Sequence, residues 1–105
     1  MNSDFVEIKF CEPWRRLNIE QVEFSLREAQ REISPGHPLH GSNQIPIAQS
    51  RLADDVLFKL GDGHVTDAHL TWSRNPEPPP FPRCRIYSSF DEWSARVMIP
   101  DSEME

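Results

Sequence analysis

Two apolar-patterned runs, separated by a glycine-bracketed aspartate, constrain the fold of this chain more than any other feature. The first run covers residues 54–60 and the second covers residues 64–72, with Gly61-Asp62-Gly63 between them. Short alternating runs joined by a glycine-containing turn are typical of a β-hairpin. The sequence therefore predicts two antiparallel strands at this place.

Side-chain parity predicts the register of the hairpin, because a shift of one residue moves every side chain to the other face. A two-residue turn would separate Leu70 and Trp72 from the apolar side chains of the first strand. We therefore expect a three-residue turn with Gly63 in a left-handed bulge position. One face is then predicted to be a core face, made of Val56, Phe58, Leu60, Ala68, Leu70 and Trp72. The other face is predicted to be mixed and solvent-facing, made of Asp55, Leu57, Lys59, Val65, Asp67, His69 and Thr71.

Two helices are predicted, one on each side of the hairpin in the sequence. Asn18 and Gln21 fit a capping box for the first, which ends at Ser34-Pro35-Gly36. Its expected buried stripe consists of Ile19, Val22, Leu26, Ala29 and Ile33, and its expected polar side of Glu23, Arg27, Glu28, Arg31 and Glu32. The second helix is predicted to start with a capping box of Ser89 and Glu92 and to end before Pro100.

Three further segments are interpreted as strands or connectors. Residues 45–52 alternate and form the predicted strand before the hairpin, and residues 84–87 form a short fourth strand. Residues 4–10 also alternate and are a candidate edge strand. The prolines in residues 76–82 predict an extended connector, with a ligand for an SH3-like or WW-like module as the alternative.

The sequence therefore predicts a single α+β domain over residues 1–100, followed by a disordered acidic tail over residues 101–105. The expected order is an N-terminal helix, a three-stranded antiparallel meander, a short fourth strand and a short C-terminal helix. Both helices are expected on the core face of the hairpin. Phe24 lies outside the apolar stripe, so either the N-terminal segment with Phe5, Ile8 or Trp14 covers it, or it is exposed and contacts a partner.

Charge and hydropathy exclude some classes of partner. The net charge is −6, and three of the acidic residues lie in the last five positions. A chain of this charge lacks the positive footprint that nucleic-acid binding needs. No apolar run approaches the ~20 residues that span a bilayer, and residues 1–10 contain no basic segment ahead of an apolar one. The sequence predicts a cytoplasmic protein that binds neither nucleic acid nor membrane.

The two cysteines, Cys11 and Cys84, allow one disulfide at most, and in the cytoplasm both are expected to be reduced. Cys84 is interpreted as a small buried hydrophobe, with a reactive thiol beside Arg83 and Arg85 as the alternative.

The four histidines do not predict a metal site. His64 and His69 are an odd number of residues apart on one strand, so their side chains point to opposite faces. His37 and His40 would need further ligands, and no spacing pattern in the sequence supplies them. No cofactor is predicted either, because Gly61-Asp62-Gly63 lacks the following helix that a phosphate-binding loop requires.

Asp55 and His69 are the one predicted pair with catalytic chemistry. The expected register puts them opposite each other beside Asp67, and a carboxylate that orients a histidine is part of a nucleophilic triad. No serine or cysteine lies in a recognisable nucleophile turn. A surface or interface pair is therefore the favoured interpretation.

Several short motifs together resemble a family of small bacterial proteins of unknown function, over roughly residues 14 to 98. The motifs are Asp54-Asp55-Val56-Leu57-Phe58-Lys59-Leu60, Asp62-Gly63, His69-Leu70-Thr71-Trp72-Ser73, Pro80-Phe81-Pro82 and Ser89-Phe90-Asp91-Glu92-Trp93. The resemblance implies a free-standing, single-domain bacterial protein. It implies no activity and no catalytic residues.

The sequence favours a non-enzymatic binding protein, such as an immunity protein, antitoxin or inhibitor, with a protein as its partner. Asp55, Asp67 and His69 are the predicted contact residues, together with the loop that contains His37 and His40. The alternative is a small enzyme that uses His69 with Asp55, or His37 with His40. A homodimer is a third hypothesis.

Overall fold

The computed structural model describes residues 9–52 and 55–104 and has an α+β fold with an antiparallel sheet, as predicted. The strands are β1 (Trp14–Arg16), β2 (Gln44–Ser50), β3 (Val56–Leu60), β4 (Val65–His69) and β5 (Arg83–Tyr87). They pair in chain order as a five-stranded meander, one strand more than predicted. Helix α2 (Ile19–Glu32) joins β1 to β2, and α3 (Phe90–Trp93), the π-helical η1 (Ser94–Met98) and α4 (Ile99–Met104) follow β5.

The predicted hairpin register is confirmed at the pairs from Val56 and Ala68 to the turn, while the predicted pair of Asp54 and Leu70 involves a residue outside the described ones. Val56 lies opposite Ala68 and Phe58 opposite Thr66, and the Leu60 N–H donates to the His64 carbonyl at 2.9 Å across the three-residue turn. Gly63 has φ +95°, a left-handed conformation that favours glycine. The residues flanking the turn are therefore sufficient to fix the register of β3 and β4.

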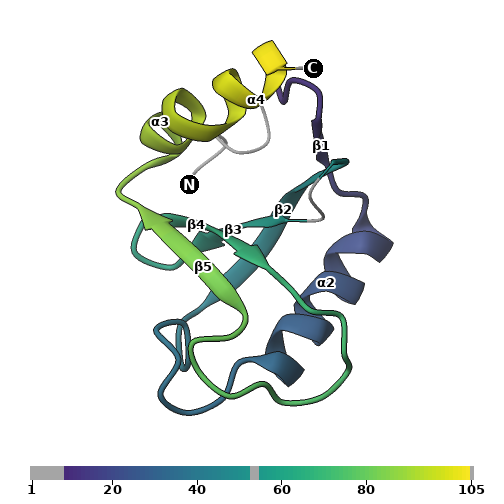
Figure 1. Ribbon diagram of the computed structural model, residues 1–105, viewed down its shortest axis with the longest axis vertical. Coiled ribbons are helices and arrows are strands. Elements are labelled where there is room, and N and C mark those ends of the chain that lie inside the picture. The colour runs from purple at the N-terminus through teal and green to yellow at the C-terminus, as the bar shows by residue number, and fades with distance from the viewer. Residues whose placement is uncertain (1–8, 53–54, 105) are drawn as a thin grey trace.

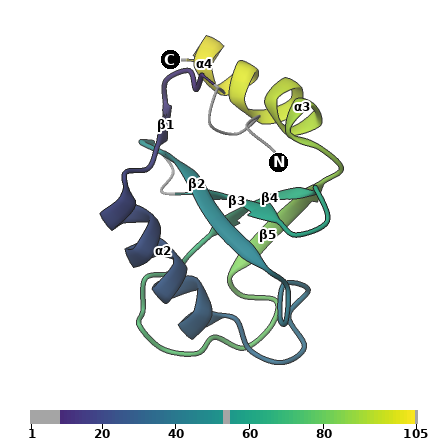
Figure 2. The ribbon, with the colours of Figure 1, turned by 180° about the vertical axis from the view of Figure 1, so that it is seen from behind.

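Both faces of the sheet are covered, which corrects the prediction that one hairpin face is solvent-facing. Figures 1 and 2 show α2 on one side of the sheet and the C-terminal helical segment on the other. Val56, Phe58, Ala68 and Leu70 form a core with Leu17 and Ala29. Leu57 and Val65, on the opposite face, are fully buried in a second core with Trp14, Ala48, Tyr87, Trp93 and Met98. The prediction that both helices pack on the same face is wrong.

Three consecutive apolar residues in β3 give the physical reason. Val56, Leu57 and Phe58 follow one another without a polar interruption. An apolar run without alternation is typical of a strand that is buried on both faces. The C-terminal helix supplies the second cover.

The C-terminal helix does not end before Pro100. The Ile99 N–H donates to the Ser94 carbonyl, five residues back, in the π-helical segment η1. Pro100 is the second residue of α4, which continues from η1 without a break, so the π-helical segment carries the helix past the proline.

The predicted disordered tail is helical as far as Met104. Asp101 in α4 accepts a 2.8 Å hydrogen bond from the Trp14 indole nitrogen, and the Trp14 ring packs edge-on against Trp93 at 4.9 Å. These contacts fasten the C-terminal helical segment to β1.

Helix α2 is rotated part of the way from its predicted orientation: Ala29 is buried, and Val22 and Ile33 pack against the core that contains Val56 and Phe58, as predicted. Its buried residues are Ser25, Glu28, Ala29 and Glu32, whereas Ile19, which was expected in the buried stripe, is 77% exposed. The capping box of Asn18 and Gln21 is present as predicted. The side of the helix that was expected to be polar therefore contributes two carboxylates to the interior.

Two further observations complete the fold. The candidate strand at residues 4–10 lies almost wholly outside the described residues, and Lys9 and Phe10 are not in a strand. In residues 9–52 and 55–104, no helix has both the length and the apolar composition that a bilayer span requires.

We expect Leu57→Ala to lower the free energy of unfolding by about 2–5 kcal/mol, because it opens a cavity in the second core. Leu52→Ala is the matched control: Leu52 is 65% exposed, so its change should stay within about 0.5 kcal/mol. Chemical denaturation measures both. Equal, small effects of the two substitutions would contradict the covered second face.

Candidate functional site

An exposed pair of aromatic rings is the most distinctive surface feature. Phe24 on α2 is 53% exposed, and its ring stacks on the half-buried Trp72, with centroids 5.6 Å apart and an interplanar angle of 15°. Trp14 does not cover Phe24, because it is buried in the second core. Phe5 and Ile8 lie outside the described residues.

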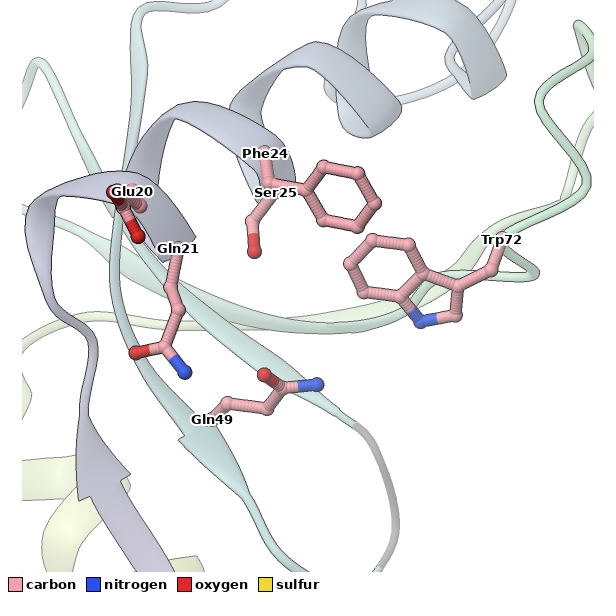
Figure 3. A pocket seen from close by; sticks show the side chains of 6 residues that line it. All are labelled: Glu20, Gln21, Phe24, Ser25, Gln49 and Trp72. Carbon is pink, nitrogen blue, oxygen red and sulfur yellow. The ribbon is translucent and has the colours of Figure 1, made fainter.

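The aromatic pair borders a groove of about 540 Å³, called here the aromatic groove. Its lining residues are Glu20, Gln21, Phe24, Ser25, Gln49 and Trp72. Figure 3 shows that α2 supplies four of these side chains, β2 supplies Gln49, and the segment after β4 supplies Trp72. Within the described residues, the Gln49 amide has no hydrogen-bond partner. The groove thus combines an apolar wall with amide groups that face the solvent.

The backbone that carries Trp72 is strained. Trp72 has φ +59° and Arg74 has φ +65°, both in the left-handed region that is unfavourable for residues with a side chain. Such a conformation costs on the order of 1 kcal/mol or more per residue and persists only where the surroundings enforce it.

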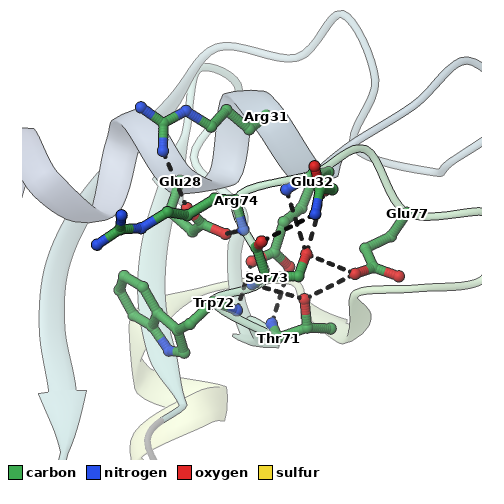
Figure 4. A network of polar contacts seen from close by, with 9 residues as sticks. Glu28, Arg31, Glu32, Thr71, Trp72, Ser73, Arg74 and Glu77 are labelled. Atoms are coloured by element: carbon green, nitrogen blue, oxygen red, sulfur yellow. Dashed lines mark hydrogen bonds and ion pairs between the residues drawn. The ribbon is translucent and has the colours of Figure 1, made fainter.

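Two buried carboxylates on α2 enforce this conformation (Figure 4). Glu32 accepts the Thr71 N–H at 2.8 Å with one oxygen and the Trp72 N–H at 2.7 Å with the other. Glu28 accepts the Arg74 N–H at 2.8 Å. Hydrogen bonds to carboxylates are stronger than those between neutral groups, so these three bonds offset the cost of the left-handed residues.

Glu77 closes the other end of the same loop. Its carboxylate accepts hydrogen bonds from the Thr71 hydroxyl at 2.9 Å and the Ser73 hydroxyl at 2.6 Å. Its backbone N–H donates to the Glu32 carbonyl at 3.0 Å, and its carbonyl accepts from the Ser34 hydroxyl. The segment from Thr71 to Glu77 is therefore fastened to the C-terminal half of α2 by side chains and backbone together.

The carboxyl groups of Glu28 and Glu32 influence each other's pKa in opposite directions. Burial, together with the hydrogen bond and the charge of Glu28, raises the pKa of Glu32 to about 7. Burial works against ionisation of Glu28 as well, but hydrogen bonds from Glu32 and the Arg74 N–H, and the nearby Arg31, lower its pKa. Near neutral pH, Glu28 is therefore the charged member of the pair, and Glu32 is partly protonated.

The predicted pair of Asp55 and His69 is present, on the opposite side of the sheet from α2. The His69 Nδ1 and an Asp55 carboxylate oxygen are 2.6 Å apart. The pair lines a pocket of about 300 Å³ with Asp67, Arg83, Cys84, Arg85, Tyr87 and Val97. Burial raises the pKa of Asp67 to about 6, although its carboxylate accepts a hydrogen bond from the Trp93 indole.

His37 and His40 do not form a site together. His37 is buried: its Nδ1 accepts the Leu39 N–H at 3.0 Å, and its Nε2 lies 2.7 Å from the Pro82 carbonyl, to which it donates. His40 is exposed. The hypothesis that His37 contacts a partner is therefore not supported by its position, since both ring nitrogens are used inside the protein.

The remaining candidates can be placed briefly. In the part of the chain that the structure describes, no three His, Cys, Asp or Glu side chains gather as metal ligands would. Cys11 and Cys84 are both free. Burial raises the pKa of the Cys84 thiol, which disfavours the reactive-thiol alternative.

The sequence contained one signal for the aromatic groove that the helical interpretation missed. Glu28 and Glu32 lie four residues apart, where like charges on an exposed helix face destabilise it. Such a pair indicates that something other than water stabilises the two carboxylates. The left-handed backbone at Trp72 had no comparable signal, because tryptophan is uncommon in that region.

Comparisons with models of known protein families, with curated proteins and with solved structures found no match to this chain.

We expect the free energy of unfolding to fall by about 1–3 kcal/mol as the pH rises from about 5 to about 8. The raised pKa of Glu32 means that the folded chain holds a proton which the unfolded chain releases at lower pH, so the stabilisation present at low pH is lost as the pH passes about 7. Asp67, with a pKa raised to about 6, adds to the lower part of this decrease.

Glu32→Gln should flatten the upper part of this pH profile, because glutamine does not titrate, whatever its effect on absolute stability. Glu23→Gln, at an exposed position of the same helix, should keep the profile of the unmodified chain. Denaturant unfolding at a series of pH values measures all three proteins. Identical slopes for Glu32→Gln and the unmodified chain would show that the carboxyl pair does not hold the extra proton.

Proposed function

We propose that this chain is a protein-binding protein, of the immunity-protein, antitoxin or inhibitor kind, and that the aromatic groove receives an apolar side chain of its partner. The observation that carries the proposal is the exposed stack of Phe24 and Trp72 on a strained backbone. Strained residues cluster at binding and catalytic sites, where the surrounding structure maintains them for function.

The energetics of protein interfaces support this assignment. Large aromatic side chains provide much of the binding energy at interfaces, in pockets that exclude water. Trp72 is held in place before any partner arrives, since Glu28 and Glu32 bind the backbone around it, and the Phe24 ring stacks on the indole. Such preorganisation reduces the entropy lost on association.

The polar part of the groove suits a peptide chain. Gln21 uses its side-chain oxygen to cap the Asn18 N–H, which leaves its amide N–H groups directed away from the cap. Gln49 offers both an amide donor and an acceptor. Two amides beside an apolar wall match the alternating polar backbone and apolar side chains of a protein segment.

This proposal moves the contact surface away from the one that the sequence predicts. Asp55, Asp67 and His69 line the other pocket, on the side of the sheet that faces the C-terminal helix. A cytoplasmic, bacterial setting and membership of the family that the motifs resemble stay predictions. They agree with a small inhibitory or protective protein.

We expect Phe24→Ser to weaken partner binding about 30-fold or more, the effect of removing an interface residue worth about 2 kcal/mol. Phe81→Ser is the matched control, because Phe81 is also exposed, at 38%, and lies outside the aromatic groove. The tagged proteins are used to retain partners from a lysate of the source organism, and the affinity for the retained protein is then measured.

The proposal requires a stoichiometric partner that Phe81→Ser keeps and Phe24→Ser loses. Circular dichroism of the variants checks that the fold is intact. If the solution mass shows a dimer that Phe24→Ser dissociates, the groove is occupied by a second copy of the chain, and a different protein partner is excluded for this site.

A small enzyme is the second candidate, and the 2.6 Å contact between Asp55 and His69 favours it. The carboxylate can orient the imidazole as a general base. Two possible nucleophiles in the pocket, Cys84 and Tyr87, have pKa values raised by burial and are therefore neutral. A catalytic pair would have to act on water or on a hydroxyl group of the substrate.

We expect any hydrolysis of chromogenic ester and phosphodiester probes to be lost in His69→Gln and kept in His64→Gln. His64 also contacts an aspartate, Asp62 at 3.0 Å, but at the tip of the hairpin and outside the pocket. The enzyme hypothesis for this pair would be removed if the unmodified chain hydrolysed the probes no faster than buffer alone. Equal rates of hydrolysis by the two variants would remove it as well.

A further inference from the structure

A second groove adjoins the aromatic groove and has a different chemistry. It has a volume of about 250 Å³ and is called here the arginine groove. Its lining residues are Arg15, Arg16, Leu17, Gln21, Gln49, Ser50 and Arg51. Three of these residues are arginines and none is acidic. Gln21 and Gln49 line both grooves, so the two form one continuous surface.

The sheet places the arginines at this junction. Arg15 on β1 lies directly opposite Gln49 on β2, and its side chain therefore shares the α2 side of the sheet with Gln49. Arg51 follows β2, where its N–H donates to the Pro13 carbonyl at 2.8 Å and its guanidinium pairs with Glu12 at 2.8 Å. Arg16 lies over the Phe10 ring at 5.2 Å. Arg16 pairs with Ala48, so its side chain lies on the opposite face of the sheet, where Ala48 and Phe10 belong to the second core. Arg15 and Arg51 are therefore the arginines that supply charge to the groove, and Arg51 shares its charge with Glu12.

We propose that the partner segment bound in the aromatic groove carries acidic side chains next to its apolar anchor, and that the arginine groove binds them. This inference rests on the proposed function of the aromatic groove and names the chemistry of its partner. Guanidinium groups bind carboxylates with two parallel hydrogen bonds, which gives both affinity and orientation. The Gln21 and Gln49 amides at the junction are placed to bind the main chain between the anchor and the acidic residues.

The overall charge favours an acidic peptide over a nucleic acid. The net charge is −6, and the exposed Glu20 and Glu23 lie on α2 near the grooves. Nucleic-acid binding needs a broad positive surface, whereas a polyphosphate backbone would extend beyond Arg15 and Arg51 and meet these carboxylates. A short acidic segment needs only a local positive site.

The dimensions suit a short segment as well. About five extended residues span roughly 17 Å, and the two grooves meet at shared residues. An apolar anchor and one or two carboxylates within about five residues of it are therefore enough to occupy both.

The test is a selection from a random-peptide library displayed on phage, against the full chain and three variants. Phe24→Ser removes the aromatic wall, and the double variant Arg15→Gln/Arg51→Gln removes charge from the arginine groove. Arg83→Gln/Arg96→Gln is the matched control, because it removes the same charge from residues outside both grooves. A synthetic copy of an enriched peptide is then titrated into each protein, and circular dichroism confirms that each is folded.

We expect the unmodified chain and the Arg83→Gln/Arg96→Gln control to enrich peptides with an aromatic or aliphatic residue close to acidic ones. Arg15→Gln/Arg51→Gln should bind the synthetic peptide at least about tenfold more weakly than the unmodified chain does. In the selection, this variant should enrich apolar peptides without acidic residues. Phe24→Ser should enrich no peptide family.

Two different failures can be told apart. If the unmodified chain enriches no peptides that depend on Phe24, the proposed function of the aromatic groove is wrong. The arginine inference is overturned if the unmodified chain enriches apolar peptides without acidic residues. It is also overturned if Arg15→Gln/Arg51→Gln enriches the same acidic peptides as the unmodified chain. In both cases the proposed function of the aromatic groove is kept. A third outcome would assign the arginine groove to phosphate and also overturn the inference. In that case the unmodified chain binds a fluorescent oligothymidylate tightly, the double variant does not, and no acidic peptides are enriched.

Discussion

The hydrogen bonds from backbone N–H groups to two glutamates of α2 determine how the helix and the loop after β4 fit together. Glu32 binds the N–H groups of Thr71 and Trp72, and Glu28 binds that of Arg74. A buried carboxylate is costly unless its oxygens have partners, and a buried N–H without an acceptor is costly too. The carboxylates and the N–H groups therefore satisfy each other, and the raised pKa of Glu32 lowers the repulsion between the two carboxyls wherever Glu32 is protonated.

Three features of the molecule follow from this one set of bonds. Helix α2 is rotated because Glu28 and Glu32 must face the sheet, which leaves Ile19 on the outside. Trp72 stays in a left-handed conformation because its N–H is held. The same rotation brings Phe24 to the edge of the buried face, beside the indole, so the aromatic groove depends on how the two carboxylates are buried.

Local patterns were predictable from the sequence, and contacts between distant segments were not. Parity across a short turn predicts both the hairpin register and the pairing of Asp55 with His69. The cover over Leu57 comes from Trp93 and Met98, in a helical segment that continues past Pro100 through a π-helical turn and lies far along the chain. The aromatic groove depends on bonds between residues 39 to 46 positions apart and on the sign of φ at Trp72, which neither periodicity nor capping reports.

The assembly of the aromatic groove from α2, β2 and the segment after β4 has a consequence for the lifetime of the chain in a cell. Its lining residues, from Glu20 to Trp72, come together only when the sheet and helix are formed. A partner that binds there has no affinity for the unfolded chain, so by mass action it stabilises the folded state. The free energy of unfolding rises by about 2.7 kcal/mol when the concentration of free partner is a hundred times its dissociation constant. Chains without a partner would be degraded faster than bound ones. Abundance of this protein would then follow the abundance of its target.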